Sequence, residues 1–271
     1  MRRIERYIKK LIIEEPLHRF RKFLTGMTET KDLESLLKLL YPISCDTPLI
    51  RFGPFNDGGY LIPDDLNGIE ACFSPGVSSV SGFEKECADR GIKVFLADRS
   101  VNNPAEEDEL FHFTKKFIGS FSNSDFITID NWVNASLPNS VDDLILQMDI
   151  ESFEYETLLS MSEETLNRFR IMVIEFHSLD QLWNKPFFSI AGRAFQKIMQ
   201  THDCVHIHPN NIANTQTINN IEIITTMEFT FLRKDRIKNA KFTNKFPHEL
   251  DSDNCTIHDS KILPTNWHHT S

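Results

Sequence analysis

The sequence predicts an α/β fold in which a mostly parallel sheet of about seven strands has helices on both faces and ends in a C-terminal antiparallel hairpin. Several short apolar runs, rich in branched residues and too short for independent helices, are typical of buried strands. These runs alternate with helical patterns, which favours parallel βαβ units. Three of the runs end in acidic residues or histidines, so charged groups are expected at one edge of the sheet.

The composition is that of an ordinary globular protein. The 271 residues are 40% hydrophobic and 25% charged, enough for one large α/β domain with a sizeable core. A formal net charge of -10 argues against nucleic acid as a partner. The five cysteines are widely spaced and form no CxxC pair, which disfavours structural disulfides and a thiolate zinc site and favours a reducing, cytoplasmic compartment. No segment reaches the roughly 20 apolar residues of a transmembrane helix.

Changes in pattern divide the chain into three parts. We expect an N-terminal helical appendage over residues 1–50, the α/β domain over 51–233 and a polar C-terminal extension over 234–271. Residues 2–23 alternate basic and apolar side chains at helical spacing, which predicts a helical lid or a contact in a homo-oligomer. The alternative for this segment is a basic amphipathic helix resting on an anionic membrane surface.

The first strands of the domain have the plan of a nucleotide-binding βαβ unit. A strand over 69–74 leads through a turn at Gly76 into a helix over 80–90, and a second strand over 93–98 ends at Asp98. This acid lies about 20 residues after the turn, as a carboxylate that binds a ribose does. The turn lacks the GxGxxG pattern that a dinucleotide pyrophosphate requires. The sequence therefore favours S-adenosylmethionine over NAD as the cofactor.

The later elements continue the alternation of strands and helices. In chain order they are strands over 110–117 and 126–129, a short helix from Asp130, a strand over 144–148 with a helix to about 169, a strand over 171–177, a helix over 187–201, a strand over 204–208, and a long strand over 221–232 that pairs with it as the hairpin. This succession describes the sheet of a class I (Rossmann-like) methyltransferase.

The functional groups at the ends of three strands are predicted to form one site. On parallel neighbouring strands these ends meet at the same edge of the sheet. The residues are Asp149 and Glu151, then Glu175 and His177, then His206 and His208. Asp, Glu and His are also the ligands of a divalent cation such as Mg²⁺ or Mn²⁺, and the candidate ligands are Asp149, Glu175, His177, His206 and His208. The alternative for either His206 or His208 alone is a structurally satisfied histidine.

Several short motifs together resemble the FkbM-type S-adenosylmethionine-dependent methyltransferases. They are Asp149-Ile-Glu-Ser-Phe-Glu154, Asp57-Gly-Gly-Tyr60, Glu175-Phe-His177, His206-Ile-His-Pro-Asn-Asn211, Glu228-Phe-Thr230 and Phe83-Glu84. The resemblance covers about residues 51–233. Ser152 stands where the family usually has glycine, which puts the strand-to-helix turn in question.

This resemblance implies a cofactor site and an acceptor site. Gly76 and Glu84 would lie near the methionine end of S-adenosylmethionine, with Asp98 on the ribose. The other residues predicted to contact or enclose the cofactor are Asp57, Gly58, Gly59 and Asp130. The predicted catalytic residues are His177 as the base, with Asp149 and Glu151. The implied activity is O-methylation of a hydroxyl on a sugar, a glycan or a similar polyhydroxylated acceptor.

Two other interpretations fit parts of the same pattern. One is an NAD-dependent nucleotide-sugar oxidoreductase, which uses the same βαβ unit but is disfavoured by the sparse glycines of the first turn. The other is a catalytically inactive Rossmann-like module that binds a partner through its N-terminal helices. The acids and histidines at the strand ends favour chemistry over that second alternative.

Overall fold

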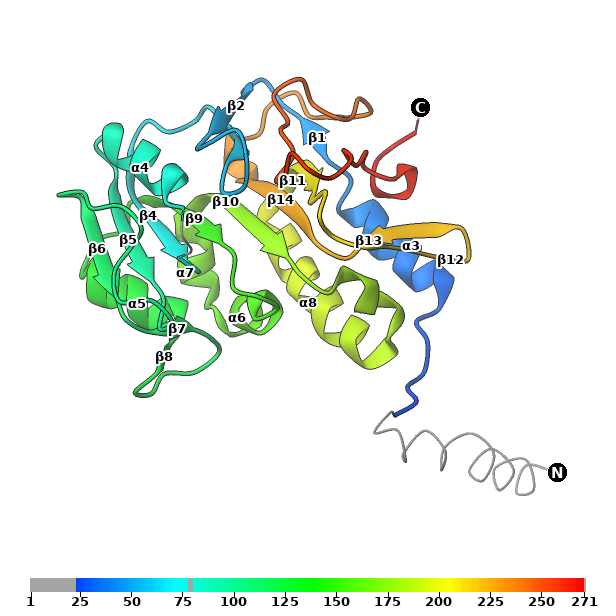
Figure 1. Cartoon of the computed structure of the whole chain (residues 1–271), viewed down its shortest axis with the longest axis horizontal. Helices are drawn as coiled ribbons and strands as arrows, with labels where there is room; N and C mark the ends of the chain where they lie inside the picture. The colour runs from blue at the N-terminus through cyan, green and yellow to red at the C-terminus, as the bar shows by residue number, and fades with distance from the viewer. Residues whose placement is uncertain (1–22, 78–79, 271) are drawn as a thin grey trace.

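The computed structural model describes residues 23–77 and 80–270. The helix predicted over residues 2–23 therefore lies, except for Phe23, outside the described residues. A seven-stranded sheet forms the centre of the molecule (Figure 1), with the spatial order β11–β14–β10–β9–β4–β5–β6. The strands are β4 (Ile69–Pro75), β5 (Lys93–Ala97), β6 (Phe111–Thr114), β9 (Asp143–Met148), β10 (Phe169–Phe176), β11 (His202–Pro209) and β14 (Met227–Arg233).

The direction of the strands follows the prediction. β14 runs antiparallel to both of its neighbours, β10 and β11, and every other pair in the sheet is parallel. The α/β class and the mostly parallel seven-stranded sheet are confirmed. The order reverses between β4 and β9, because the chain continues from β4 toward β5 and β6 but from β9 toward β10. Such a reversal leaves a crevice at the carboxyl ends of the two strands.

Both faces of the sheet are buried. Phe73 and Leu146 belong to the larger apolar cluster, whereas their chain neighbours Cys72 and Ile145 belong to the smaller one. Because side chains alternate between the faces, burial of both faces explains why the strands read as continuous apolar runs. The helices are α3 (Thr30–Leu39), α4 (Gly82–Asp89), α5 (Ile129–Ser136), α6 (Glu154–Ser160), α7 (Glu163–Arg168) and α8 (Lys185–Thr201), with short 3-10 turns η2 (Leu179–Trp183), η3 (Lys234–Arg236) and η4 (Thr265–Trp267).

The segments before and after the α/β domain pack on the same core. Leu33 of α3 and Trp267 of η4 are fully buried in the larger cluster, together with residues of α5, α6 and α8. Helix α4 and the β2–β3 hairpin cover the opposite face (Figure 1). The small strand pairs are β1 (Ile43–Ser44) with β15 (Lys241–Phe242), β2 (Leu49–Phe52) with β3 (Tyr60–Pro63), β7 (Phe117–Ile118) with β8 (Phe126–Ile127), and β12 (Thr215–Ile218) with β13 (Ile221–Ile224). In the part of the chain that the structure describes, no helix is long and apolar enough to cross a membrane.

Three predicted elements are interrupted. The strand expected over 110–117 is divided into β6, in the central sheet, and β7, which pairs with β8 in a separate small sheet. The helix expected to run to about residue 169 is divided into α6 and α7, because the hydroxyl of Ser162 caps a new helix by accepting the N–H of Thr165 at 3.1 Å. The strand expected over 221–232 is divided into β13 and β14. Its first part pairs with β12 through a turn in which Asn219 and Asn220 have φ of 51° and 62°, the left-handed conformation of a tight hairpin.

His202 at the start of β11 gives the fold a specific sensitivity to acid. Its side chain is completely buried, and one ring nitrogen lies 2.6 Å from the carbonyl oxygen of Phe169. Burial lowers the pKa of His202 to about 4. The neutral form is therefore favoured in the folded state, so its contribution to stability is complete above pH 6.5 and is lost as the pH falls through about 4.

We predict that acid destabilises the wild type more than a variant that cannot titrate at this position. Between pH 7 and pH 4 the free energy of unfolding of the wild type should fall by up to about 3 kcal/mol more than that of His202→Gln. Urea unfolding at each pH measures both values. Parallel pH curves for the two proteins would contradict the prediction.

Candidate functional site

At the crevice between β4 and β9, the backbone at Gly76 lies in close contact with the backbone at Asp149. Gly76 follows β4 with φ +91°, and a Cβ at this position would overlap the carbonyl oxygen of Asp149, which follows β9. The N–H of Gly76 donates to the carbonyl oxygen of Ala97 at 3.1 Å. The turn that the sequence placed at Gly76 thus lies against the first acid of the Asp149–Glu154 motif, at the reversal of strand order.

A cavity of about 830 Å³ opens at the carboxyl ends of β4, β5 and β9. Its walls are largely apolar, and Asp98 lies among them at the end of β5, only 9% exposed. One carboxylate oxygen of Asp98 accepts the N–H and the hydroxyl of Ser100, both at 2.6 Å. The described lining residues are Gly76, Val77, Ala97, Asp98, Ser100, Val101, Asn103, Ala105, Phe117, Ile118, Phe126, Asp149, Ile150, Glu151 and Phe153.

A second, smaller cavity of about 30 Å³ shares Gly76 and Asp149 with the first. Asp57, Gly58 and Glu84, which the sequence assigned to the cofactor, line it. Burial raises the pKa of Glu84, whose carboxylate accepts the hydroxyl of Ser74. Gly59 is not among its described lining residues. A Cβ there would overlap the carbonyl oxygen of Pro54, so the glycine at position 59 allows two parts of this loop to approach closely.

Asp130 takes a different place from the other predicted cofactor residues. It lines neither cavity among the described residues, and its carboxylate instead accepts the N–H of Ser162 at 3.0 Å and the hydroxyl of Thr165 at 2.5 Å. These partners lie at the N-terminus of α7, where a negative charge is stabilising. The position indicates a helix-capping role for Asp130.

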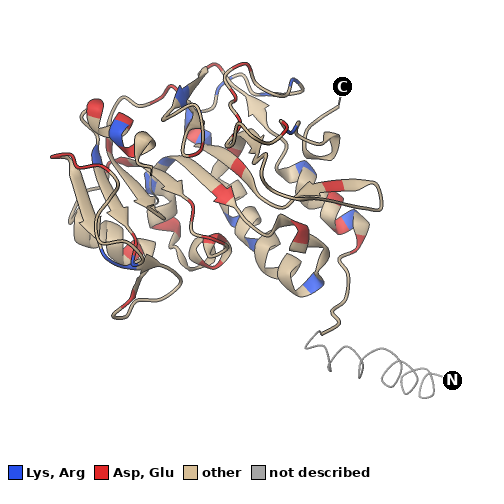
Figure 2. Cartoon of the chain, viewed as in Figure 1, with Lys and Arg blue, Asp and Glu red and all other residues tan. Residues whose placement is uncertain are grey.

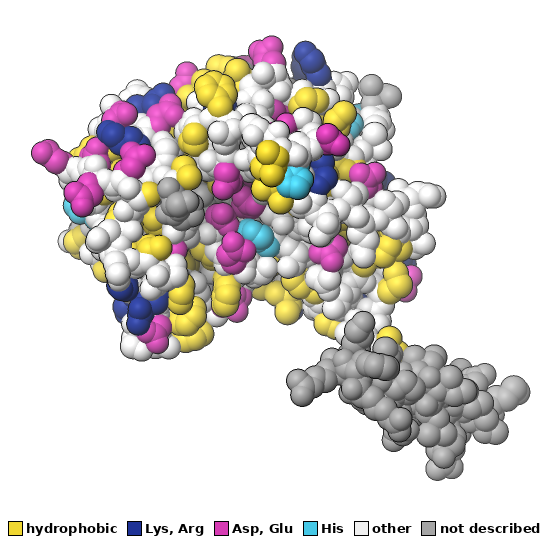
Figure 3. Space-filling view, in the orientation of Figure 1, with side chains coloured by type: hydrophobic (Ala, Val, Ile, Leu, Met, Phe, Trp, Pro, Cys, Tyr) yellow, Lys and Arg dark blue, Asp and Glu magenta, His cyan; other side chains and the backbone are white. Residues whose placement is uncertain are grey.

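The strand-end residues of β9 and β10 do come together, in what we call the carboxylate–histidine cluster: Asp149, Glu151, Glu175 and His177. The Nε2 atom of His177 lies 3.8 Å from Asp149, 3.6 Å from Glu151 and 3.9 Å from Glu175. Acidic residues appear at the ends of the central strands in Figure 2, and Figure 3 shows acidic side chains beside histidine in the same part of the surface. The geometry gathers three carboxyl groups around one imidazole at this edge of the sheet.

Glu154 fixes the orientation of the imidazole. Its side chain is completely buried, and its Oε1 atom accepts the Nδ1–H of His177 at 3.1 Å. The same oxygen accepts the N–H groups of Ile150 at 3.2 Å and Ser152 at 3.1 Å. Glu151 and Ser152 both have positive φ, 55° and 79°. Ser152 therefore adopts the left-handed conformation that usually favours glycine.

Burial and charge shift the pKa values of this cluster. Burial alone would lower the pKa of His177, but the carboxylates of Glu154, Asp149 and Glu175 raise it to about 9. Burial raises the pKa of Asp149 to about 6 although His177 opposes the shift. Without a ligand, His177 is thus protonated at neutral pH. It becomes a base only when another positive charge enters the cluster and offsets the carboxylates.

The row of ionisable groups continues across the sheet. In the sheet, Glu175 of β10 is paired with Glu228 of β14, and Glu228 is paired on its other side with His208 of β11. Asn210 donates to Glu175 at 3.0 Å and Asn254 donates to Glu228 at 2.7 Å. Burial raises the pKa of Glu175 well above its usual value and that of Glu228 to about 7.

Four of the five residues predicted as one metal site fall into two groups of potential ligands, and Glu175 is in neither group. Among the described residues, Asp149 and His177 gather with Glu151, whereas His206 and His208 gather with Asp251 from the C-terminal segment. Because β14 lies between β10 and β11, the ends of the two parallel strands are not adjacent. Sequence reasoning missed Glu154, Glu228, Asp251 and Asn254. Only Glu154 and Glu228 carried a signal, since both lie in the motifs that were recognised.

Comparison with known proteins adds little. No protein-family model matches the chain, and no curated protein matches it. Among solved structures, the crystal structure of EvdMO1 is similar at 9% identity and a TM-score of 0.27, over 78% of this chain and 48% of that one. The match spans about half the length of EvdMO1. A likeness of this strength carries no conclusion about activity.

Proposed function

We propose that the protein is a class I, S-adenosylmethionine-dependent O-methyltransferase that acts on a hydroxyl of a sugar, a glycan or a similar polyhydroxylated acceptor. The observation that carries the proposal is that a large, cofactor-sized cavity is lined by Asp149 and Glu151, which also belong to the carboxylate–histidine cluster. The strand order supports the same fold class. Numbered along the chain, the sheet reads 3-2-1-4-5-7-6, which is the doubly wound order with one antiparallel strand inserted.

The residues of the large cavity fit S-adenosylmethionine better than NAD. Three acids, Asp98, Asp149 and Glu151, line it, and the described lining residues include no lysine or arginine. Such a wall attracts a sulfonium cation and repels an anionic pyrophosphate. Asp98 has a carboxylate oxygen left to accept ribose hydroxyls, and the aromatic rings of Phe117 and Phe126 offer an apolar surface for a base.

Side chains of this protein would remove the proton from the acceptor hydroxyl. S-adenosylmethionine supplies the methyl group and brings a positive charge. The Nε2 atom of His177, held by the hydrogen bond from Nδ1 to Glu154, would accept the proton of the acceptor hydroxyl. Asp149 and Glu151 would stabilise the imidazolium that results. If these two acids and His177 instead hold a divalent cation such as Mg²⁺ or Mn²⁺, Nε2 of His177 would be a ligand and not the base, and the cation would lower the pKa of the hydroxyl in its place.

Ligand-induced thermal stabilisation tests the cofactor assignment. S-adenosylhomocysteine should raise the melting temperature of the full chain, whereas NAD should not, because only a ligand that binds the native state stabilises it. Labelled S-adenosylmethionine with a panel of glycans then tests transfer. Stabilisation by NAD alone would favour the oxidoreductase, and no stabilisation by either would favour the inactive binding module.

A substitution at the end of β5 should weaken the cofactor complex selectively. Asp98→Asn removes a charged acceptor from the predicted ribose site and is expected to reduce affinity for S-adenosylhomocysteine about 10–100-fold. Calorimetric titration measures the change. Asp64→Asn, which alters an exposed acid outside both cavities, is the matched control. Equal affinity in Asp98→Asn and the control would remove Asp98 from the site.

A further inference from the structure

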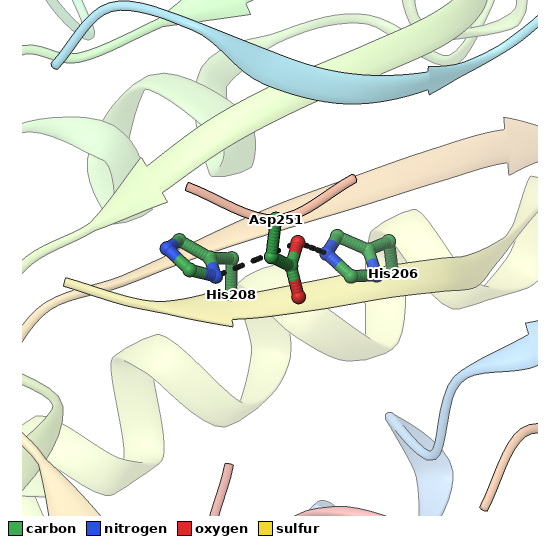
Figure 4. A group of neighbouring side chains, drawn as sticks. All are labelled: His206, His208 and Asp251. Carbon is green, nitrogen blue, oxygen red and sulfur yellow. Dashed lines mark hydrogen bonds and ion pairs between the residues drawn. The ribbon is translucent and has the colours of Figure 1, made fainter. Parts of the chain in front are cut away.

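The second group of potential ligands lies at the far side of the sheet from the large cavity. His206 and His208 project from the same side of β11, and Asp251 reaches them from the C-terminal segment (Figure 4). One carboxylate oxygen of Asp251 lies 2.8 Å from Nε2 of His206 and 3.6 Å from Nδ1 of His208. We call these three residues the His–His–Asp cluster.

Burial of these three polar side chains lowers the stability of the fold unless their polar atoms have partners. The side chains of His206, His208 and Asp251 are 4%, 7% and 7% exposed. Neither ring nitrogen of His208 makes a hydrogen bond among the described residues: Nδ1 has only the ion-pair contact with Asp251 at 3.6 Å. A buried polar group without a partner costs about 1–3 kcal/mol. A hydrogen bond between His206 and Asp251 alone therefore does not account for the cluster.

The spacing of the three groups suits a metal ion. One ligand atom from each residue lies within 4.8 Å of the others. Ligands at metal distances of about 2.0–2.2 Å are about 3–3.5 Å apart when they surround one ion, close to the two separations given above. Two imidazoles and one carboxylate are the donors that zinc and its first-row neighbours prefer, whereas Mg²⁺ and Ca²⁺ prefer oxygen donors.

We propose that His206, His208 and Asp251 bind a divalent ion of the zinc class, at a site separate from the carboxylate–histidine cluster. The ion would take the lone pair of a His208 nitrogen and draw Asp251 toward the sheet. His206 also borders a cavity of about 270 Å³, so one side of the cluster faces open space rather than packed side chains.

The ion would fix the C-terminal segment over the site. Close to Asp251 in the chain, Ser252 donates to the carbonyl oxygen of Phe55, and Asn254 donates to Glu228 and lies 3.4 Å from Asp57. Asp57 lines the smaller cavity beside Gly76 and Asp149. The metal would thus hold in place a strap that connects β11 and β14 to the loop before β3.

Metal binding to the full chain tests the proposal directly. After chelation and dialysis, the protein is titrated with Zn²⁺ by calorimetry, and Co²⁺ binding is followed by visible absorption. The wild type is expected to bind a single ion of either metal at this site, with nitrogen-ligand absorption bands for Co²⁺. Loss of an outer hydrogen-bond partner of a ligand costs about 10–100-fold in metal affinity, so loss of a direct ligand in Asp251→Ala or His208→Ala should cost ~100-fold or more.

The controls separate this site from the carboxylate–histidine cluster. His177→Ala should retain the ion, and Zn²⁺ should slow proteolysis of residues 243–262 in the wild type but not in Asp251→Ala. Asp251 lies outside the strands and helices, so that variant stays informative if His208→Ala fails to fold. Unchanged Zn²⁺ affinity in Asp251→Ala would overturn the proposal, as would loss of the ion in His177→Ala alone.

Discussion

Replacement of His177 by alanine is expected to reduce methyl transfer about 10²–10⁴-fold while S-adenosylhomocysteine binding is retained. The Nε2 atom of His177, the proposed base, lies 3.6–3.9 Å from three carboxylates, two of which, Asp149 and Glu151, line the large cavity. It does not line the large cavity among the described residues, so its loss should leave the cofactor contacts intact. Single-turnover rates with labelled cofactor, compared with calorimetric affinity, separate chemistry from binding.

Two further variants sharpen this test. Glu154→Gln keeps an oxygen that can accept the N–H groups of Ile150 and Ser152 but removes the charge beside Nδ1 of His177. Its turnover should fall between those of the wild type and His177→Ala. His258→Ala alters an exposed histidine and should leave the rate unchanged. Near-normal turnover in His177→Ala would remove the base role, and loss of cofactor affinity as well would indicate structural damage instead.

Replacement of Gly76 by alanine should destabilise the protein by more than about 4 kcal/mol and abolish cofactor binding. The left-handed conformation at φ +91° would cost an alanine about 1–2 kcal/mol. The larger part comes from overlap of Cβ with the carbonyl oxygen of Asp149, because neither backbone can retreat from the sheet. Urea unfolding followed by circular dichroism measures the loss.

Gly91→Ala provides the matched control for this effect. Gly91 also has positive φ, +76°, but a Cβ there would meet nothing within 4 Å. Only the backbone strain remains, so the expected loss is about 1 kcal/mol. The difference between the two variants isolates the close approach of β4 and β9. Equal unfolding midpoints for Gly76→Ala and Gly91→Ala would show that the two strand ends are not in contact.

Local pattern was sufficient to predict much of the fold. The strands that became β4, β5, β9 and β10 were recognisable because they are buried on both faces and therefore mostly apolar. Asp149 and His177 were predicted to meet because the ends of parallel neighbours share an edge, and they lie 3.8 Å apart. The interruptions at Ser162 and at Asn219 were missed, because a cap or a tight turn is decided by a single side chain within an apolar pattern.

Long-range partners could not be predicted in the same way. Asp251 comes from a polar segment without periodicity, and nothing in its neighbours indicates that it folds back to His206 on β11. The insertion of β14 between β10 and β11 also separated two strand ends that the sequence placed side by side. Strand order is set by packing of the whole chain, so four of the five residues predicted as one metal site lie in two separate groups.

One oxygen, Oε1 of Glu154, couples the position of the loop at residues 150–152 to that of the His177 imidazole, because it accepts hydrogen bonds from both. It accepts from His177 and also holds the Glu151–Ser152 turn, where two non-glycine residues in the left-handed region cost about 1–3 kcal/mol each. A proton lost or gained by His177 therefore changes the force that restrains the turn, and a movement of the turn changes the basicity of His177. By thermodynamic reciprocity, an acceptor that displaces this loop on binding would change the pKa of His177, the proposed base.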